Sequence, residues 1–119
     1  MRLKLLTLVF LLILILFCNV VHAQAHSASL TWTASTDSGV SYNIYRLSGA
    51  CPSAATTGFA KITAAPLTAT TYTDSTVAPG TYCYYATAVL NGAESIPSNL
   101  ASAVILPAAP TALSVAGTN

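Results

Sequence analysis

Few residues of this chain could perform acid–base, nucleophilic or metal chemistry. Beyond the N-terminal apolar segment the carboxylates are Asp37, Asp74 and Glu94, which are far apart in sequence and which we expect in turns. His26 is the one histidine beyond that segment. Catalysis and metal binding need several such groups at defined spacing, and no such motif occurs. The sequence therefore predicts a protein that is not an enzyme, with no catalytic, cofactor or metal site, and with Asp74 bonding nearby backbone.

The first 25 residues have the three parts of a secretory signal peptide. Arg2 and Lys4 form a positive start, an apolar run follows over 5–17, and Ala23-Gln24-Ala25 resembles a cleavage site. Cleavage would leave a mature chain that begins near His26. The apolar run is short for a membrane span, which needs about 20 residues, so a retained anchor is the weaker alternative. Lipid attachment at Cys18 is weaker still, because the residue before it is Phe17.

Two cysteines, Cys51 and Cys83, remain after the leader. Disulfides persist in exported proteins, and a small domain with a modest core benefits from a covalent cross-link. A reactive thiol pair is the alternative, but the two cysteines are not in a CxxC arrangement. We therefore expect a structural disulfide between Cys51 and Cys83.

The charges beyond the leader argue against polyanionic partners. Two bases, Arg46 and Lys61, stand against three acids, Asp37, Asp74 and Glu94, which gives a net charge of −1. A near-neutral chain with two basic side chains has no electrostatic footprint for nucleic acid or for anionic lipid. We expect no nucleic-acid partner, and no membrane association after cleavage.

Short segments with alternating polarity, separated by turn signals, predict an all-β domain over residues 26–106. The regular segment around Tyr84 is followed by Asn91-Gly92, a strong hairpin signal because both residues tolerate positive φ. No segment after the leader has a helical apolar stripe. The expected strands are 28–34, 40–47, 59–62, 72–75, 82–89 and 98–106.

The residues from 30 to 104 resemble the fibronectin type III family. The motifs that carry the likeness are Trp32, Tyr42-Asn43-Ile44-Tyr45-Arg46, the run Val77-Ala78-Pro79-Gly80-Thr81-Tyr82, and the pairs Glu94-Ser95 and Pro97-Ser98 before the last strand, which suit bacterial members. The resemblance implies an immunoglobulin-like antiparallel β-sandwich. It makes Trp32 and Tyr42 core residues, and it makes Tyr82 the tyrosine-corner residue that bonds back to the backbone near the turn.

Two departures from the family pattern concern the ends of the domain. Tyr82 follows Val77 one residue sooner than usual, and cleavage leaves almost no residues for the family's first strand. The Pro/Ala-rich tail, residues 107–119, resembles the start of a next domain, with a strand around Leu113 and Val115. The tail is either a linker of a multidomain array or a strand donated to the next protomer, which would join copies head to tail.

If the two strands pair as in the family that the chain resembles, Tyr45 and Tyr85 project from the outward face of one sheet. They form either an aromatic surface for sugar or protein or an ordinary cross-strand pair that stabilises the sheet. A disulfide from Cys51 to Cys83 would fold the loop at 48–58 over this same face.

These observations predict a non-catalytic exported bacterial module. It would be periplasmic, cell-surface or extracellular, and it would act in binding, in adhesion or as a spacer with a protein or carbohydrate partner. The alternative is a self-assembling surface subunit that associates head to tail through 107–119. Fold alone does not decide between them, because this sandwich hosts many roles.

Overall fold

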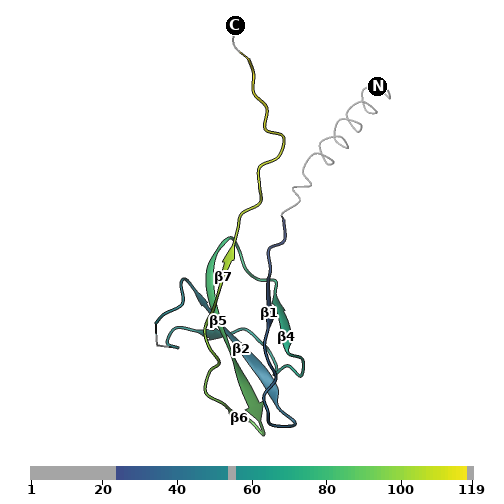
Figure 1. Ribbon diagram of the computed structural model, residues 1–119, viewed down its shortest axis with the longest axis vertical. Helices are drawn as coiled ribbons and strands as arrows, with labels where there is room; N and C mark the ends of the chain where they lie inside the picture. Colours follow the sequence, from purple (N-terminus) through teal and green to yellow (C-terminus); the bar gives the residue numbers. More distant parts are fainter. Residues whose placement is uncertain (1–23, 54–55, 118–119) are drawn as a thin grey trace, which may run out of the picture.

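The computed structural model describes residues 24–53 and 56–117 (Figure 1). All regular structure in these ranges is β, as the sequence predicts, and it forms two antiparallel sheets. Except for Gln24 and Ala25, the predicted leader lies outside the described residues. The strands are β1 (Ala28–Thr31), β2 (Ser41–Ser48), β3 (Ala60–Lys61), β4 (Thr71–Asp74), β5 (Gly80–Leu90), β6 (Ala93–Glu94) and β7 (Ala101–Ile105).

The two sheets face each other across one core. β1 and β4 form the small sheet, while the large sheet has the order β3-β2-β5, with β6 and β7 both pairing the far edge of β5. The core centres on Ala28, Ile44 and Tyr84, which come from both sheets. Because each strand contributes alternate residues to this layer, the sequence folds as an antiparallel β-sandwich.

The long β2–β5 pair is the frame of the large sheet. It runs in register from Ser41 opposite Val89 to Ser48 opposite Tyr82. Tyr42 and Ile44 face the core, whereas Asn43 and Tyr45 lie on the outward face. The turn after β5 places Asn91 at φ 51° and Gly92 at φ 83°, the left-handed conformations that an Asn-Gly hairpin requires.

The approach to β7 differs from the uninterrupted strand expected over 98–106, because serine hydroxyls replace carbonyls in its pairing with β5. The backbone N–H of Ala86 donates to Ser98 Oγ and that of Ala88 donates to Ser95 Oγ, both at 2.9 Å. The serine N–H groups donate to the carbonyls of the same two alanines. Regular pairing therefore begins only at Ala101, opposite Tyr84.

The chain enters β1 and leaves β7 at the same end of the sandwich (Figure 1). Ala28 lies opposite Asp74, and Ile105 lies opposite Gly80, and a short connection joins Asp74 to Gly80. From this end the described part of the tail continues away from the sheets, and its residues 107–117 are exposed.

Candidate functional site

An aromatic cluster lies on the outward face of the large sheet. Tyr45 and Tyr85 are cross-strand partners, and their rings stack with centroids 4.7 Å apart and planes 13° from parallel. Phe59, just before β3, adds a third ring, 4.9 Å from that of Tyr85. All three side chains are partly exposed. We call Phe59, Tyr45 and Tyr85 the aromatic face.

A carboxylate holds the tip of this cluster. Glu94 of β6 accepts hydrogen bonds from the Tyr45 hydroxyl, at 2.8 and 3.0 Å, and from the amide Nδ2 of Asn43. The bonds from Tyr45 and Asn43 lower the pKa of Glu94 below its ordinary value. Partial burial, followed by the bond to Glu94, raises the pKa of Tyr45 to about 12. The site is thus a stacked aromatic group with one hydrogen-bonded negative charge, Glu94, and with the positive charge of Lys61 opposite Tyr45 in the sheet.

A disulfide joins Cys51 in the β2–β3 connection to Cys83 in β5, with 5.0 Å between the Cα atoms. Cys83 is completely buried on the outward face of the large sheet, where it lies opposite Leu47. The bond and the Phe59 contact draw both ends of the connection onto this face. The aromatic face is therefore fixed by a covalent link at one side and by packing at the other.

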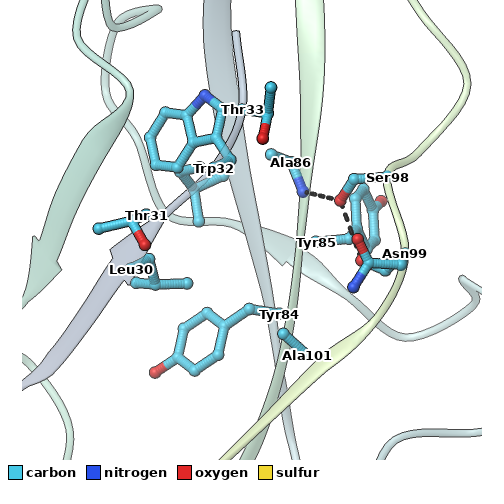
Figure 2. A pocket seen from close by; sticks show the side chains of 11 residues that line it. Leu30, Thr31, Trp32, Thr33, Tyr84, Tyr85, Ala86, Ser98, Asn99 and Ala101 are labelled. Carbon is cyan, nitrogen blue, oxygen red and sulfur yellow. Dashed lines mark hydrogen bonds between the residues drawn. The ribbon is translucent and has the colours of Figure 1, made fainter.

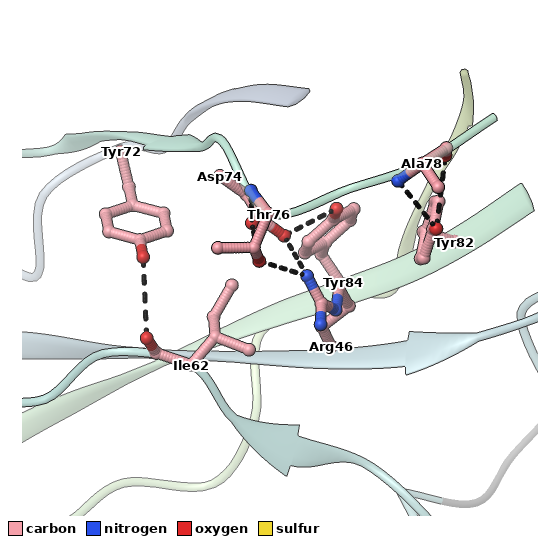
Figure 3. A network of polar contacts seen from close by, with 8 residues as sticks. All are labelled: Arg46, Ile62, Tyr72, Asp74, Thr76, Ala78, Tyr82 and Tyr84. Atoms are coloured by element: carbon pink, nitrogen blue, oxygen red, sulfur yellow. Dashed lines mark hydrogen bonds and ion pairs between the residues drawn. The ribbon is translucent and has the colours of Figure 1, made fainter. Parts of the chain in front are cut away.

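Asp74 is not simply a turn residue. It ends β4, is 1% exposed, and pairs with Arg46 of β2 at 2.7 Å (Figure 3). Its carboxylate also accepts bonds from the Tyr84 hydroxyl and from the hydroxyl and backbone N–H of Thr76. Burial opposes ionisation of Asp74, but the bonds from Thr76 and Arg46 outweigh it and hold its pKa below the usual value. This cluster ties the two sheets together.

The remaining residues singled out from the sequence, Trp32, Tyr42 and Tyr82, make packing and hydrogen-bond contacts within the sandwich. Trp32 follows β1 and packs edge-on against Tyr42, with ring centroids 5.4 Å apart, and both adjoin the core. The Tyr82 hydroxyl accepts a bond from the Ala78 N–H at 3.2 Å and donates one to the Ala78 carbonyl at 3.1 Å (Figure 3). The guanidinium of Arg46 lies 5.6 Å from the centre of the Tyr82 ring.

Sequence reasoning missed three participants in these sites. The sequence predicts Phe59 only as a strand residue and Glu94 in a turn, whereas Glu94 lies in β6. Asp74 bonds the nearby Thr76 N–H as predicted. Its burial among Arg46 and Tyr84 was not predicted. Hydrophobic periodicity gives no sign that Phe59 packs on Tyr85, since the contact depends on how the β2–β3 connection crosses the sheet. A carboxylate within or beside a strand pattern, as in TYTD at 71–74, is the signal that could have marked Asp74.

The described residues hold no group of three or more histidine, cysteine or acidic side chains that could bind a metal ion. In the same ranges there is no helix long and apolar enough to cross a membrane. The chain matches no protein-family model, and no curated protein is significantly similar to it.

Proposed function

We propose that the chain is an exported, non-catalytic module of the fibronectin type III type, which binds a protein or carbohydrate through its aromatic face. The β1–β4 sheet packs against a sheet of order β3-β2-β5-β7. A fibronectin type III sandwich from which the first strand is left out has this same strand order, which supports the family assignment. The disulfide supports an oxidising location outside the cytoplasm.

The aromatic face is the observation that carries the binding proposal. Stacked tyrosines offer large, rigid contact area at low entropic cost, and each brings a polar tip. Here the Tyr45 hydroxyl and the Glu94 carboxylate bond each other, which fixes both groups before a partner arrives. A preorganised surface loses less freedom on binding than a mobile one.

The carboxylates support a role without catalysis. Asp74 is occupied by Arg46, Tyr84 and Thr76, and its lowered pKa makes it a poor proton donor or acceptor near neutral pH. Glu94, on the other face of the large sheet, is likewise held in its ionised form. The two acids lie on opposite faces and so do not form a carboxylate pair.

Binding of the exported protein to a glycan array and to immobilised cell-envelope proteins tests the proposal. We expect wild type to be retained and Tyr45→Ala to bind with an affinity lower by about tenfold or more. Burying the tyrosine ring against a partner contributes roughly 1.5 kcal/mol or more, and Tyr45→Ala removes this contribution. Tyr45→Phe separates the ring from its polar tip: it keeps the stacked ring and removes the bond to Glu94, so we expect a smaller loss of binding than with Tyr45→Ala. If wild type and Tyr45→Ala are retained equally, the partner binds elsewhere on the protein. If wild type is retained neither by the glycan array nor by the immobilised proteins, the proposal is wrong.

A further inference from the structure

One edge of the sandwich, between β1 of the small sheet and β7 of the large sheet, has a groove where the core is not covered. Between β1 and β7 it has a volume of about 380 Å³ near Trp32, and a second stretch of about 220 Å³ continues it along the rest of β1. Leu30 and Trp32 lie on one side of the groove, and Ala86 and Ser98 lie on the other (Figure 2). Its floor includes the core residues Ile44 and Tyr84.

The edge of β1 beside this groove has unpaired backbone groups. Within residues 24–53 and 56–117, β1 pairs only with β4, and β7 pairs only with β5. The N–H of Trp32 bonds the carbonyl of Thr70, so the backbone groups of Leu30 and Ala28 also point toward β4. Those of Ser29 and Thr31 therefore point outward, toward the groove side, where a further strand could bond them.

The tail carries a segment that fits such a site. Leu113 is 94% exposed and Val115 is 90% exposed, so both apolar side chains are free to contact another molecule. In an extended chain they share one face. Ala112 has a left-handed backbone (φ 56°), so an extended segment that carries both side chains can begin at Leu113.

The direction of the tail favours the groove of another copy over the groove of its own molecule. The tail leaves the sandwich at the end where β1 begins, so a tail folding back on its own groove would run parallel to β1. That reversal would also have to occur over residues 106–112, where Pro107 and Pro110 favour extended backbone. A tail from another copy can enter from the far end and pair antiparallel, which is the more stable ladder.

We propose that residues 113–116 of one copy add as an antiparallel strand to β1 of the next copy, with Leu113 and Val115 inserted into the groove between β1 and β7. The tail continues the direction of its own β7, so this pairing relates neighbouring copies head to tail rather than by a twofold axis. Such a contact leaves a free tail at one end and a free groove at the other, and it propagates into a chain. Parallel pairing would instead give a closed, swapped dimer.

The first test measures the mass of the exported protein by size-exclusion chromatography with light scattering over a wide concentration range. We expect wild type to form a ladder of oligomers that grows with concentration, and Leu113→Ser/Val115→Ser to remain monomeric. Ile96→Ser is the matched control, because Ile96 is equally exposed (88%) but lies outside the tail. Monomeric wild type at all concentrations, a closed dimer, or oligomers in the double variant each overturn the proposal.

The second test addresses the groove itself and uses Trp32, the single tryptophan, as its reporter. A synthetic peptide of residues 107–119 is added to the exported Leu113→Ser/Val115→Ser protein, whose own tail cannot compete. We expect a saturable change in tryptophan fluorescence, and about tenfold weaker binding for each apolar side chain replaced in the peptide.

Ser29→Pro in the protein that binds the peptide tests whether the outward edge of β1 takes part. It removes one outward N–H and leaves the bonds of β1 to β4 in place, so we expect weaker peptide binding by a protein that still unfolds cooperatively. Absence of a saturable signal with the native peptide contradicts the proposal, as does equal binding of the native and doubly substituted peptides.

Discussion

The outward face of the large sheet and the β1–β7 edge of the sandwich differ in how far the chain covers them. On the outward face of the large sheet, the disulfide and Phe59 hold the β2–β3 connection against Cys83 and Tyr85. Between β1 and β7 no described segment lies over Leu30 and Trp32, and the backbone of Ser29 and Thr31 faces outward. One side is closed by the chain itself, whereas the other exposes the edge of the core.

This small domain obtains its stability mainly where the chain covers its own core. Its buried core residues are few, and a sandwich of this size depends on cross-links and polar clusters as well as on apolar burial. The disulfide and the Asp74 cluster supply these at the closed face and at the end shared by β1 and β7. Within residues 24–53 and 56–117 the groove has neither feature, and under our proposal the tail of another copy supplies stabilisation there. Disruption of the closed regions should therefore cost much more than any change at the open one.

The largest effect should come from removing the disulfide. Replacing Cys51 and Cys83 by alanine frees a loop with a sequence separation of 32 residues, and should lower the free energy of unfolding by about 3–4 kcal/mol in the chain-entropy model. Urea unfolding of the oxidised wild type and the double variant measures this loss. A loss below about 1 kcal/mol would show that the closed face does not depend on its covalent link.

The second largest effect should come from Asp74→Ala. It leaves Arg46 and the buried Tyr84 hydroxyl without their shared acceptor, and should cost about 2–3 kcal/mol, since the Arg46 side chain is 26% exposed and can regain some water. Urea midpoints at neutral pH measure it. Thr76→Val is the milder comparison, because it removes one hydroxyl and keeps the Arg46–Asp74 pair. Equal losses in both variants would contradict a cluster centred on the carboxylate.

The same residue predicts the acid dependence of stability. Because the pKa of Asp74 is lowered in the folded state, the unfolded chain takes up this proton first as the pH falls. Its stabilisation is therefore complete above the ordinary aspartate pKa of about 3.9 and is lost as the pH falls through the lowered value. The difference in unfolding free energy between wild type and Asp74→Asn should shrink over that window. A difference that is constant with pH contradicts the assignment.

The strands could be predicted from the sequence more completely than the contacts between them. Alternation marked both partners of the β2–β5 pair, and Asn91-Gly92 marked the hairpin, because these patterns are local. The bonds from Ser95 and Ser98 to β5, and the convergence of Arg46, Thr76 and Tyr84 on Asp74, depend on tertiary register, which no local period encodes. For the candidate site, the strand pairing implied by the family resemblance places Tyr45 beside Tyr85, whereas Phe59 and Glu94 reach the site from the β2–β3 connection and from β6.

A smaller effect is expected on the aromatic face. Tyr45→Phe keeps the ring stack and removes the bond to Glu94, so it should lower the unfolding free energy by only about 0.5–1 kcal/mol. Its sharper consequence is at Glu94, whose pKa should rise toward the ordinary value once the Tyr45 bond is lost. An NMR titration of the Glu94 carboxyl in both proteins measures this shift. An unchanged pKa would mean that Asn43 alone holds the carboxylate.

The smallest effect should be at the open side, and it should depend on concentration. In a dilute monomer Leu113 and Val115 contact almost nothing, so Leu113→Ser/Val115→Ser should change the unfolding free energy by less than about 0.5 kcal/mol. If tails fill grooves, however, association stabilises the folded state by mass action. The melting temperature of wild type should then rise with protein concentration, while that of the double variant stays flat, as differential scanning calorimetry at several concentrations would detect. If the melting temperatures of both proteins are independent of concentration, the edge of β1 is not filled by a tail. The open groove would then be a structural feature without a role in association.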